Sequence, residues 1–387
     1  MDHTVSRMRI LHMSTEYPPM ISGGIANAVF GIVSASAHAG IETHVAFIGD
    51  ANEKKYGNEL SIPHKLSYEA TSKTVKVFLI SWENAIEESI SLVRTLNPDI
   101  IHLHTFLLFP LVYAIKKETS TPIVYTIHAF ERAHDNKNPL DYLLQSQTQD
   151  ALISLVDIVI ALSQTEKELV SHYCKQSSEK IRLVGNGTGT YAKFSSDQPR
   201  NPHLVLYSGR FDKNKGVDDF LAAIPYVAEH YPDVNFVLIG GPLDTSREEM
   251  RRRWLNDSFP CKDKVTFTGY VTREELLRWY SKAGILVVPS SYDTFPLVIL
   301  DGMQHGLAVI ASSIGGALDI IRHGETGLLF TPKDIGALAS CIIMLLKDPN
   351  LQHQIGANAA KEIQNNWLWS NIINRLLVVY REAIQTK

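Results

Sequence analysis

The sequence predicts an α/β protein made of two Rossmann-like domains, and three observations support this prediction. Short apolar runs alternate with amphipathic stretches along nearly the whole chain, which indicates parallel strands covered by helices on both faces. The alternation stops in a polar stretch over residues 188–201 and then restarts with a new apolar run. With 387 residues, 45% of them hydrophobic, the chain can build a core in each domain.

The first half of the chain contains six apolar runs that we expect to be strands. They lie at Arg9–Met13, Thr43–Gly49, Val75–Ser81, Asp99–His104, Pro122–His128 and Asp157–Leu162. Apolar residues repeat with helical spacing from Ile25 to Ala37, and Gly40 follows as a stop signal. A second helical set is Ile86, Ile90 and Val93. This order predicts strands and helices in alternation.

The second half repeats the pattern and sets the expected domain boundaries. Its expected strands lie at Leu204–Ser208, Phe236–Ile239, Val265–Thr268, Ile285–Pro289 and Leu307–Ala311, and helices follow Pro349. We therefore expect a first domain over residues 1–190, a linker over 191–202, a second domain over 203–365 and a final helix over 366–387. Ligands of open α/β sheets bind beyond the carboxyl ends of the strands, so two such sheets facing each other would form a binding cleft.

Bulk properties exclude several classes of protein. The formal net charge is −4 and no basic block stands out, which argues against a nucleic-acid partner. The sequence contains no run of about 18 uncharged apolar residues, so it predicts no membrane-spanning helix. Three cysteines at unrelated spacings indicate reduced thiols in a reducing cytoplasm. The oligomeric state is not indicated by any pattern.

Two glycines, Gly23 and Gly24, follow the first strand and open the first helix. They would let backbone N–H groups approach an anion or a sugar at the positive end of the helix. A simple tight turn explains the pair equally well. The G-x-G-x-x-G fingerprint of dinucleotide-binding enzymes is absent, because Asn27 stands where a third glycine would end the run. This disfavours a NAD enzyme.

Two cations follow the first strand of the second domain. Arg210 comes directly after Gly209, and Lys215 precedes Gly216 where the next helix opens. A guanidinium fork and an ammonium group at a helix N-terminus suit a diphosphate. The alternative is a pair of solvated surface cations, but the position after a strand, with glycines beside both, favours the diphosphate site.

Two carboxylates and three histidines end strands or follow them. Asp293 and Asp301 lie eight positions apart, and carboxylates bind sugar diols through paired hydrogen bonds. On spacing alone, however, two ordinary acids, one of them a helix cap, explain them better. His128 ends one expected strand, while His102 and His104 end the strand before it, and residue type alone does not choose among the three. The sequence lacks HExxH, a Cys/His spacing and D-x-D, so we expect no metal and no cofactor.

Taken together, these strings resemble the retaining glycosyltransferases of family 4, a group 1 family that includes glycogen synthase and sucrose synthase and has the two-domain GT-B fold. Each string is unspecific alone, but all of them occur in the family's order, over nearly the whole chain. The strings are Glu16-Tyr-Pro-Pro, Gly23-Gly24, Asp99–His104, Tyr125–His128, Gly185-Asn-Gly187, Gly209-Arg-Phe, Lys215-Gly216, Pro289-Ser-Ser, Asp301, Gly315-Gly316 and Gly324–Phe330.

The resemblance implies a role for each matching residue. Arg210 and Lys215 look like the pair that grips the donor diphosphate. Asp293 stands where the family has a glutamate near the donor sugar, and Asp301 where a second glutamate binds the ribose. Further donor contacts are implied for Gly23, Gly24, Gly209, Thr294, Phe295, Pro296 and Leu297. His128 looks like the donor-side histidine of the acceptor-binding first domain, and the final helix is expected to cross back onto that domain.

The resemblance also implies a mechanism and a substrate class. The catalytic set would be His128, Arg210, Lys215 and Asp293, and transfer would proceed by front-face attack without a covalent nucleophile. We expect a UDP-linked hexose donor, such as N-acetylglucosamine, and a small soluble hydroxyl acceptor, such as the aminocyclitol 2-deoxystreptamine. The acceptor contacts are expected in the polar segment Glu131–Asn138, at Glu131, His134 and Asn136.

Both acidic positions depart from the family's glutamates, since aspartate withdraws each carboxylate by roughly 1.5 Å. Two alternatives therefore stay open beside the transferase. A nucleotide-sugar epimerase of the same fold would isomerise the donor without an acceptor. A catalytically silent protein would bind the nucleotide but release no nucleotide diphosphate.

Overall fold

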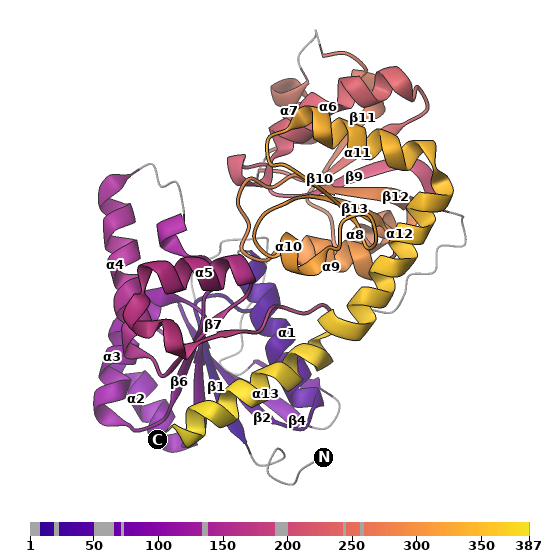
Figure 1. Cartoon of the computed structure of the whole chain (residues 1–387). Helices are drawn as coiled ribbons and strands as arrows, with labels where there is room; N and C mark the ends of the chain where they lie inside the picture. The colour runs from indigo at the N-terminus through magenta and orange to yellow at the C-terminus, as the bar shows by residue number, and fades with distance from the viewer. Residues whose placement is uncertain are drawn as a thin grey trace. The chain divides into compact units, whose positions relative to one another are not determined.

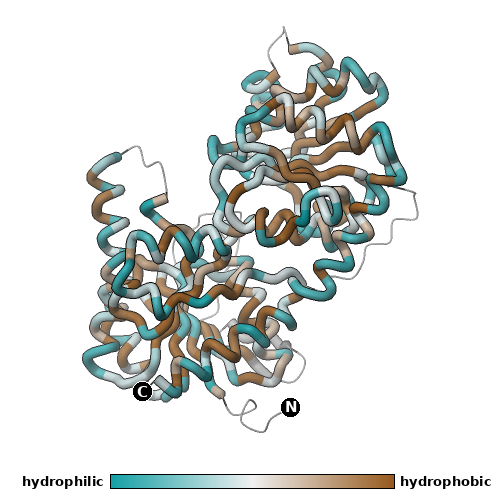
Figure 2. The backbone as a smooth tube through the Cα atoms, in the orientation of Figure 1, coloured by the Kyte–Doolittle hydropathy of each residue, from teal (hydrophilic) through white to brown (hydrophobic). Residues whose placement is uncertain are grey.

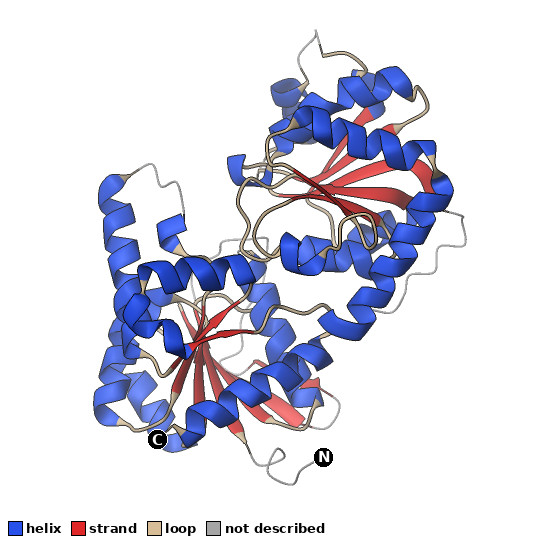
Figure 3. Cartoon of the chain, in the orientation of Figure 1, coloured by secondary structure: helices blue, strands red, loops and turns tan. Residues whose placement is uncertain are grey.

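The computed structural model describes residues 8–18, 23–49, 66–70, 73–133, 138–189, 200–242, 245–255 and 259–386. The chain divides into two compact units, unit 1 (Met1–Gly189 with Trp369–Lys387) and unit 2 (Thr190–Leu368). Each contains a mainly parallel sheet flanked by helices (Figures 1 and 3). Most of the expected linker, residues 191–199, lies outside the described residues. The predicted fold of two Rossmann-like sheets is confirmed.

Among the described residues, unit 1 has an eight-stranded sheet in the order β3-β4-β2-β1-β5-β6-β7-β8, in which only the edge strand β3 is antiparallel to its neighbour. Its strands are β1 (Arg9–Ser14), β2 (Glu42–Ile48), β3 (Leu66–Ala70), β4 (Lys73–Ile80), β5 (Ile100–Leu103), β6 (Ile123–Thr126), β7 (Ile158–Ala161) and β8 (Ile181–Leu183). Its helices are α1 (Gly24–His38), α2 (Ala85–Leu96), α3 (Phe109–Glu118), α4 (Pro139–Leu155), α5 (Gln164–Tyr173) and α13 (Trp369–Gln385).

The described part of unit 2 has six parallel strands in the order β11-β10-β9-β12-β13-β14, the doubly wound order of dinucleotide-binding folds. They are β9 (Asn201–Gly209), β10 (Asn235–Gly240), β11 (Val265–Gly269), β12 (Ala283–Val288), β13 (Ala308–Ser312) and β14 (Leu328–Phe330). The helices are α6 (Val217–His230), α7 (Arg247–Trp254), α8 (Arg273–Lys282), α9 (Leu297–Gln304), α10 (Ala317–Ile320), α11 (Ile335–Lys347) and α12 (Pro349–Glu362), after which a π-helical turn spans Ile363–Trp367.

The apolar runs become strands because both faces of each sheet are covered. All residues of β5, β6, β7, β12 and β13 are buried, and Figure 2 shows the strands largely brown, whereas the helices carry both brown and teal. Local signals fix the helix ends: capping boxes at Ser246/Glu249 and Thr272/Glu275 begin α7 and α8. Within the described residues, no helix combines the length and apolar character that crossing a bilayer requires.

Candidate active site

The strand order of unit 2 has a switch point between β9 and β12. From β9 the chain proceeds outward to β10 and β11, and it then returns to β12 on the other side. The loops that follow β9 and β12 are tied together, because the backbone N–H of Ser291 donates to the carbonyl of Asn214 at 2.8 Å. Such switch points are the usual ligand sites of open α/β sheets, so the residues of these two loops form the candidate active site.

The loop after β9 is shaped by one aspartate and one glycine. Asp212 accepts hydrogen bonds from the backbone N–H groups of Asn214 and Lys215, which caps a short 3-10 turn. Gly216 then takes a left-handed conformation with φ of +68°, and a Cβ there would lie 1.9 Å from the carbonyl oxygen of Pro289. Only glycine allows this turn to come so close to the end of β12.

Opposite charges meet at this point. The Nζ atom of Lys215 lies 2.6 Å from Oδ2 of Asp293, and both side chains are partly covered. Arg210 is more exposed, and its Nε lies 2.9 Å from Oδ2 of Asp212. The two cations predicted to hold a diphosphate and the carboxylate predicted to contact a sugar thus lie in two loops joined by an ion pair.

The loop after β12 packs against the loop after β13. Gly315 has a φ of +45°, and a Cβ there would lie 2.0 Å from the carbonyl oxygen of Asp293. The backbone N–H of Gly316 donates to the carbonyl of Thr294 at 2.9 Å. Phe295 is buried, with its ring centroid 5.5 Å from that of Trp367. These contacts support the backbone around Asp293, in addition to the ion pair between its side chain and Lys215.

Three other residues expected to contact the donor, Pro296, Leu297 and Asp301, lie in α9 or next to it. Pro296 is the N-cap residue, and Leu297 is the first helical residue, so α9 begins four residues after Asp293. Asp301 lies further along the same helix, as expected, and its Oδ2 is 2.8 Å from Nη1 of Arg273 in α8. A ribose bound to Asp301 would therefore share this carboxylate with Arg273.

In unit 1, the switch point lies between β1 and β5. Gly24 begins α1, as expected, and Gly23 precedes it in an extended conformation with φ of 173°. A Cβ on Gly24 would meet no atom within 4 Å, and one on Gly23 would meet only Oε2 of Glu16, at 4.0 Å. Among the described residues, packing therefore does not explain these two glycines, which leaves room for a ligand at the N-terminus of α1.

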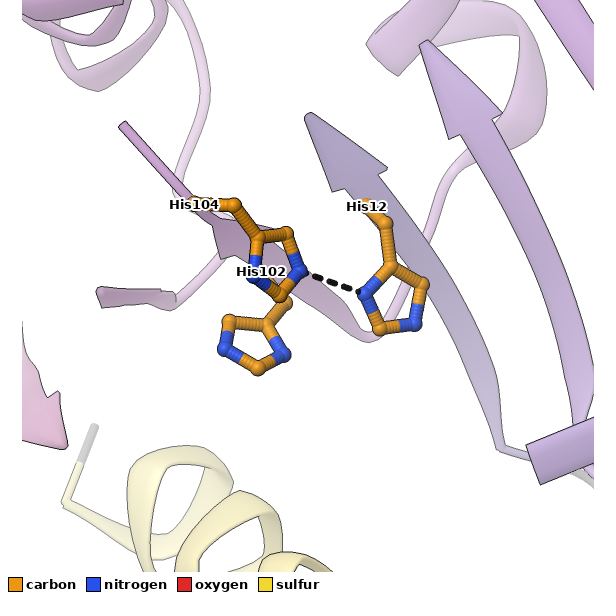
Figure 4. A group of neighbouring side chains, drawn as sticks. All are labelled: His12, His102 and His104. Carbon is orange, nitrogen blue, oxygen red and sulfur yellow. Dashed lines mark hydrogen bonds between the residues drawn. The ribbon is translucent and has the colours of Figure 1, made fainter. Parts of the chain in front are cut away.

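Four histidines gather at the same switch point. His12 of β1 pairs in register with His102 of β5, and both are buried together with His104. Figure 4 shows these three rings and the contact of 3.0 Å between Nδ1 of His12 and Nε2 of His104. His128 lies two residues beyond the end of β6, is half-buried, and has its Nε2 3.2 Å from Nδ1 of His104.

Sequence reasoning missed this cluster because it did not single out His12. The signal was present in the strand order: β1 and β5 are neighbours in a doubly wound sheet, and their pairing brings His12 beside His102. His102 bonds to Tyr380 and Thr126 through its two nitrogens, each at 2.7 Å.

Of the residues predicted to contact the acceptor, Glu131 lies in a short 3-10 turn after β6. Its backbone N–H donates to Oε1 of Gln149 at 2.8 Å, and burial raises the pKa of its carboxyl group. His134 and Asn136 lie outside the described residues.

The family of the chain follows from its similarity to known sequences. Residues 22–190 match the sequence model described as "Glycosyltransferase Family 4", and residues 190–362 match "Glycosyl transferases group 1". The chain belongs to the family 4 glycosyltransferases. It is a retaining enzyme that uses a nucleotide-sugar donor. The predicted family is confirmed.

Curated relatives of this glycosyltransferase match almost its full length. Glycogen synthase of Mycobacterium tuberculosis is 26% identical, over 97% of this chain and 95% of its own length. A D-inositol 3-phosphate glycosyltransferase of Pseudarthrobacter chlorophenolicus is also 26% identical, over 94% of this chain and 91% of its own.

Solved structures share the fold of the glycosyltransferase. Sucrose-phosphate synthase from Thermosynechococcus elongatus aligns with a TM-score of 0.81 and 23% identity, over 98% of this chain and 100% of that one. Anabaena HepE in complex with UDP-glucose aligns with a TM-score of 0.72 and 17% identity, over 98% and 100% of the two chains. The predicted GT-B architecture is confirmed.

Proposed function

We propose that this glycosyltransferase moves a hexose from a UDP-sugar to a hydroxyl group of a small polyol. The observation that carries the proposal is the placement of Arg210, Lys215 and Asp293 in the two loops at the switch point of unit 2, where Lys215 and Asp293 are joined at 2.6 Å. The donor base is supported by HepE, which was solved with UDP-glucose. The acceptor class is supported by relatives named for a cyclitol phosphate. N-acetylglucosamine and an aminocyclitol such as 2-deoxystreptamine are the sugar and the acceptor we propose to test first.

In the proposed mechanism, positioning and charge neutralisation supply the catalysis. The diphosphate binds at Lys215 and Arg210 and at the N-terminal amides of α9, which place positive charge where negative charge develops as the donor bond breaks. The diphosphate replaces Asp293 as the partner of Lys215. The carboxylate of Asp293, released from this ion pair, then lies close to the sugar. The leaving phosphate takes up the proton of the acceptor hydroxyl, and no covalent nucleophile on the protein is involved.

The test is release of nucleotide diphosphate from a panel of nucleotide-sugars. Each donor is incubated in EDTA with and without inositol phosphates, aminocyclitols or glycogen. Acceptor-dependent release from a UDP-hexose with a small polyol is the expected result. Release only with glycogen would contradict the acceptor class. Isomerised donor without release would indicate an epimerase, and nucleotide binding without either reaction would indicate a silent binder.

Variants of the two cations test the site itself. We expect Arg210→Ala and Lys215→Ala each to lower kcat about a hundredfold, because each removes a charged donor from the developing negative charge. Lys213→Ala is the matched control, since Lys213 is exposed in the same short turn and should leave kcat unchanged. If folded Arg210→Ala and Lys215→Ala proteins both kept full turnover, the assignment would be wrong.

A further inference from the structure

Three of the clustered histidines form one hydrogen-bonded chain. Nδ1 of His12 contacts Nε2 of His104 at 3.0 Å, and Nδ1 of His104 contacts Nε2 of His128 at 3.2 Å. His12 is fully buried and His104 is 1% exposed, whereas His128 is half-buried. The chain therefore leads from the interior of unit 1 toward its surface, and the Nδ1 atom of His128 is its outer end.

Burial favours the neutral form of all three rings. Burial away from water disfavours the charged form, and it lowers the pKa of His12 to about 3 and that of His128 to about 4. The pKa of His104 is also lowered well below its ordinary value, first by burial and then by its histidine neighbours. Each ring consequently carries one N–H group and one lone pair.

Two arrangements of the N–H groups satisfy both contacts, and they differ at His12. If the bonds run inward, from His128 to His104 to His12, then Nε2 of His12 carries a hydrogen. If they run outward, that atom is a bare acceptor. Among the described residues, Nε2 of His12 has no hydrogen-bond partner. A buried N–H without an acceptor is the rarer and more costly defect, so the outward direction is favoured.

The geometry points to His104 as a positioning residue that, oriented by His12, fixes His128 as the tautomer protonated on Nδ1. In this state Nε2 of His128 accepts from His104, and Nδ1–H is left to donate to a hydroxyl or phosphate oxygen of a bound substrate. Within the described parts of the chain, that Nδ1 has no protein partner. His128 then has no lone pair left to take a proton from the acceptor hydroxyl, which agrees with proton uptake by the leaving phosphate.

A metal ion is the competing explanation for the cluster. Ligand atoms of His12, His102 and His104 lie within 4.8 Å of one another. However, both nitrogens of His102 already bond to Tyr380 and Thr126 at 2.7 Å, so a metal would have to break one of these bonds. The hydrogen-bond chain accounts for His12, His104 and His128 without any such rearrangement, and we therefore favour it.

The tautomer is measured without substrate, on the full chain labelled with 15N in histidine. Long-range proton–nitrogen correlations distinguish an imidazole protonated on Nδ1 from one protonated on Nε2, and His128→Asn identifies the signals of His128. The expected result is protonation on Nδ1, retained in His104→Asn, whose amide can still donate, and shifted toward Nε2 in His104→Leu. Protonation on Nε2 in the unmodified protein, or stoichiometric bound zinc, would overturn the inference.

Kinetics test what the tautomer does, and this step rests on the proposed function. The Asn amide at position 128 places an N–H close to the former Nδ1, whereas the Gln amide reaches the former Nε2. We expect kcat/KM of His128→Asn to be roughly tenfold higher than that of His128→Gln, because about one hydrogen bond separates the two variants. Circular dichroism checks that both variants are folded. Equal losses would refute donation from Nδ1. If the unmodified enzyme transferred sugar from no nucleotide-sugar at all, the proposed function would be wrong, whereas the tautomer assigned by NMR would still hold.

Discussion

At the residue scale, the candidate site depends on charged groups in the loops that follow two neighbouring strands, β9 and β12. Arg210, Lys215 and Asp293 follow predicted strands, so their placement at one edge of the sheet could be predicted. The ion pair between Lys215 and Asp293 could not, because it depends on the paths of two loops. Their roles in catalysis remain predictions. His12 was missed because its neighbour His102 is distant in the sequence and is brought close only by strand pairing.

Burial also raises the pKa of one glutamate that no sequence motif singled out. Glu166 lies in the first turn of α5 and is 3% exposed. One carboxyl oxygen accepts from the backbone N–H of Leu162 at 2.7 Å, while the other has no partner among the described residues. Burial raises the pKa of Glu166 well above its ordinary value.

The raised pKa of Glu166 predicts a pH-dependent effect of Glu166→Gln. The unfolded chain releases the proton near the ordinary pKa, whereas the folded chain keeps it, so the contribution of Glu166 to stability is complete at acidic pH and is lost as pH rises. The melting temperature of Glu166→Gln minus that of the unmodified protein should therefore increase from pH 4.5 to pH 8. Glu168→Gln, in the exposed part of the same helix, should show no such trend. A difference independent of pH would contradict the prediction.

At the element scale, long apolar runs were predicted well and short edge elements were not. The central strands appear in the structure with ends shifted by one or a few residues, as for β6, which stops at Thr126 rather than His128. The edge strands β3, β8 and β14 were missed. β8 and β14 have three residues each, too few to show a periodicity, and β14 follows the turn glycines Gly324 and Gly327, which drew the interpretation toward a turn.

The glycine turn before α6 gives a prediction at this scale. Gly216 and Gly324 both have positive φ, at +68° and +80°, but a Cβ would clash with Pro289 only at Gly216, since the space around Gly324 is open. Gly324→Ala should cost about 1 kcal/mol for the backbone conformation alone. Gly216→Ala should cost clearly more and should also lower kcat, because it separates the loops that carry Lys215 and Asp293. Denaturant titration and kinetics of both variants measure this, and equal effects would contradict the proposed close approach.

At the scale of the whole molecule, the chain leaves unit 1 after Gly189, builds unit 2 and returns to unit 1 at Trp369. The returning helix α13 is anchored by several contacts: Trp369 donates its backbone N–H to the carbonyl of Thr188 at 3.0 Å, and Tyr380 bonds to His102. The final helix was predicted, but its partners in unit 1 were not, because Thr188 and His102 lie 181 and 278 positions before the residues that contact them.

The indole of Trp369 packs against two glycines. This contact predicts that Gly31→Ala changes stability in opposite directions with and without the indole. A Cβ on Gly31, inside α1, would lie 2.1 Å from the indole, and one on Gly187 would lie 2.8 Å away. Trp369→Ala should lower the free energy of unfolding by about 3 kcal/mol by leaving a cavity, whereas Trp82→Ala, at a site 43% exposed, should have little effect.

Gly31→Ala alone should also be destabilising, because the new methyl group displaces the indole. In a Trp369→Ala background that clash is gone, and alanine is the better helix former by about 1 kcal/mol, so Gly31→Ala should then stabilise the protein. A double-mutant cycle from denaturant titrations measures the coupling between the two sites. If Gly31→Ala had the same effect in both backgrounds, α13 would not be held against α1 by this contact, and the return of the chain to unit 1 would have to depend on the contacts further along the helix.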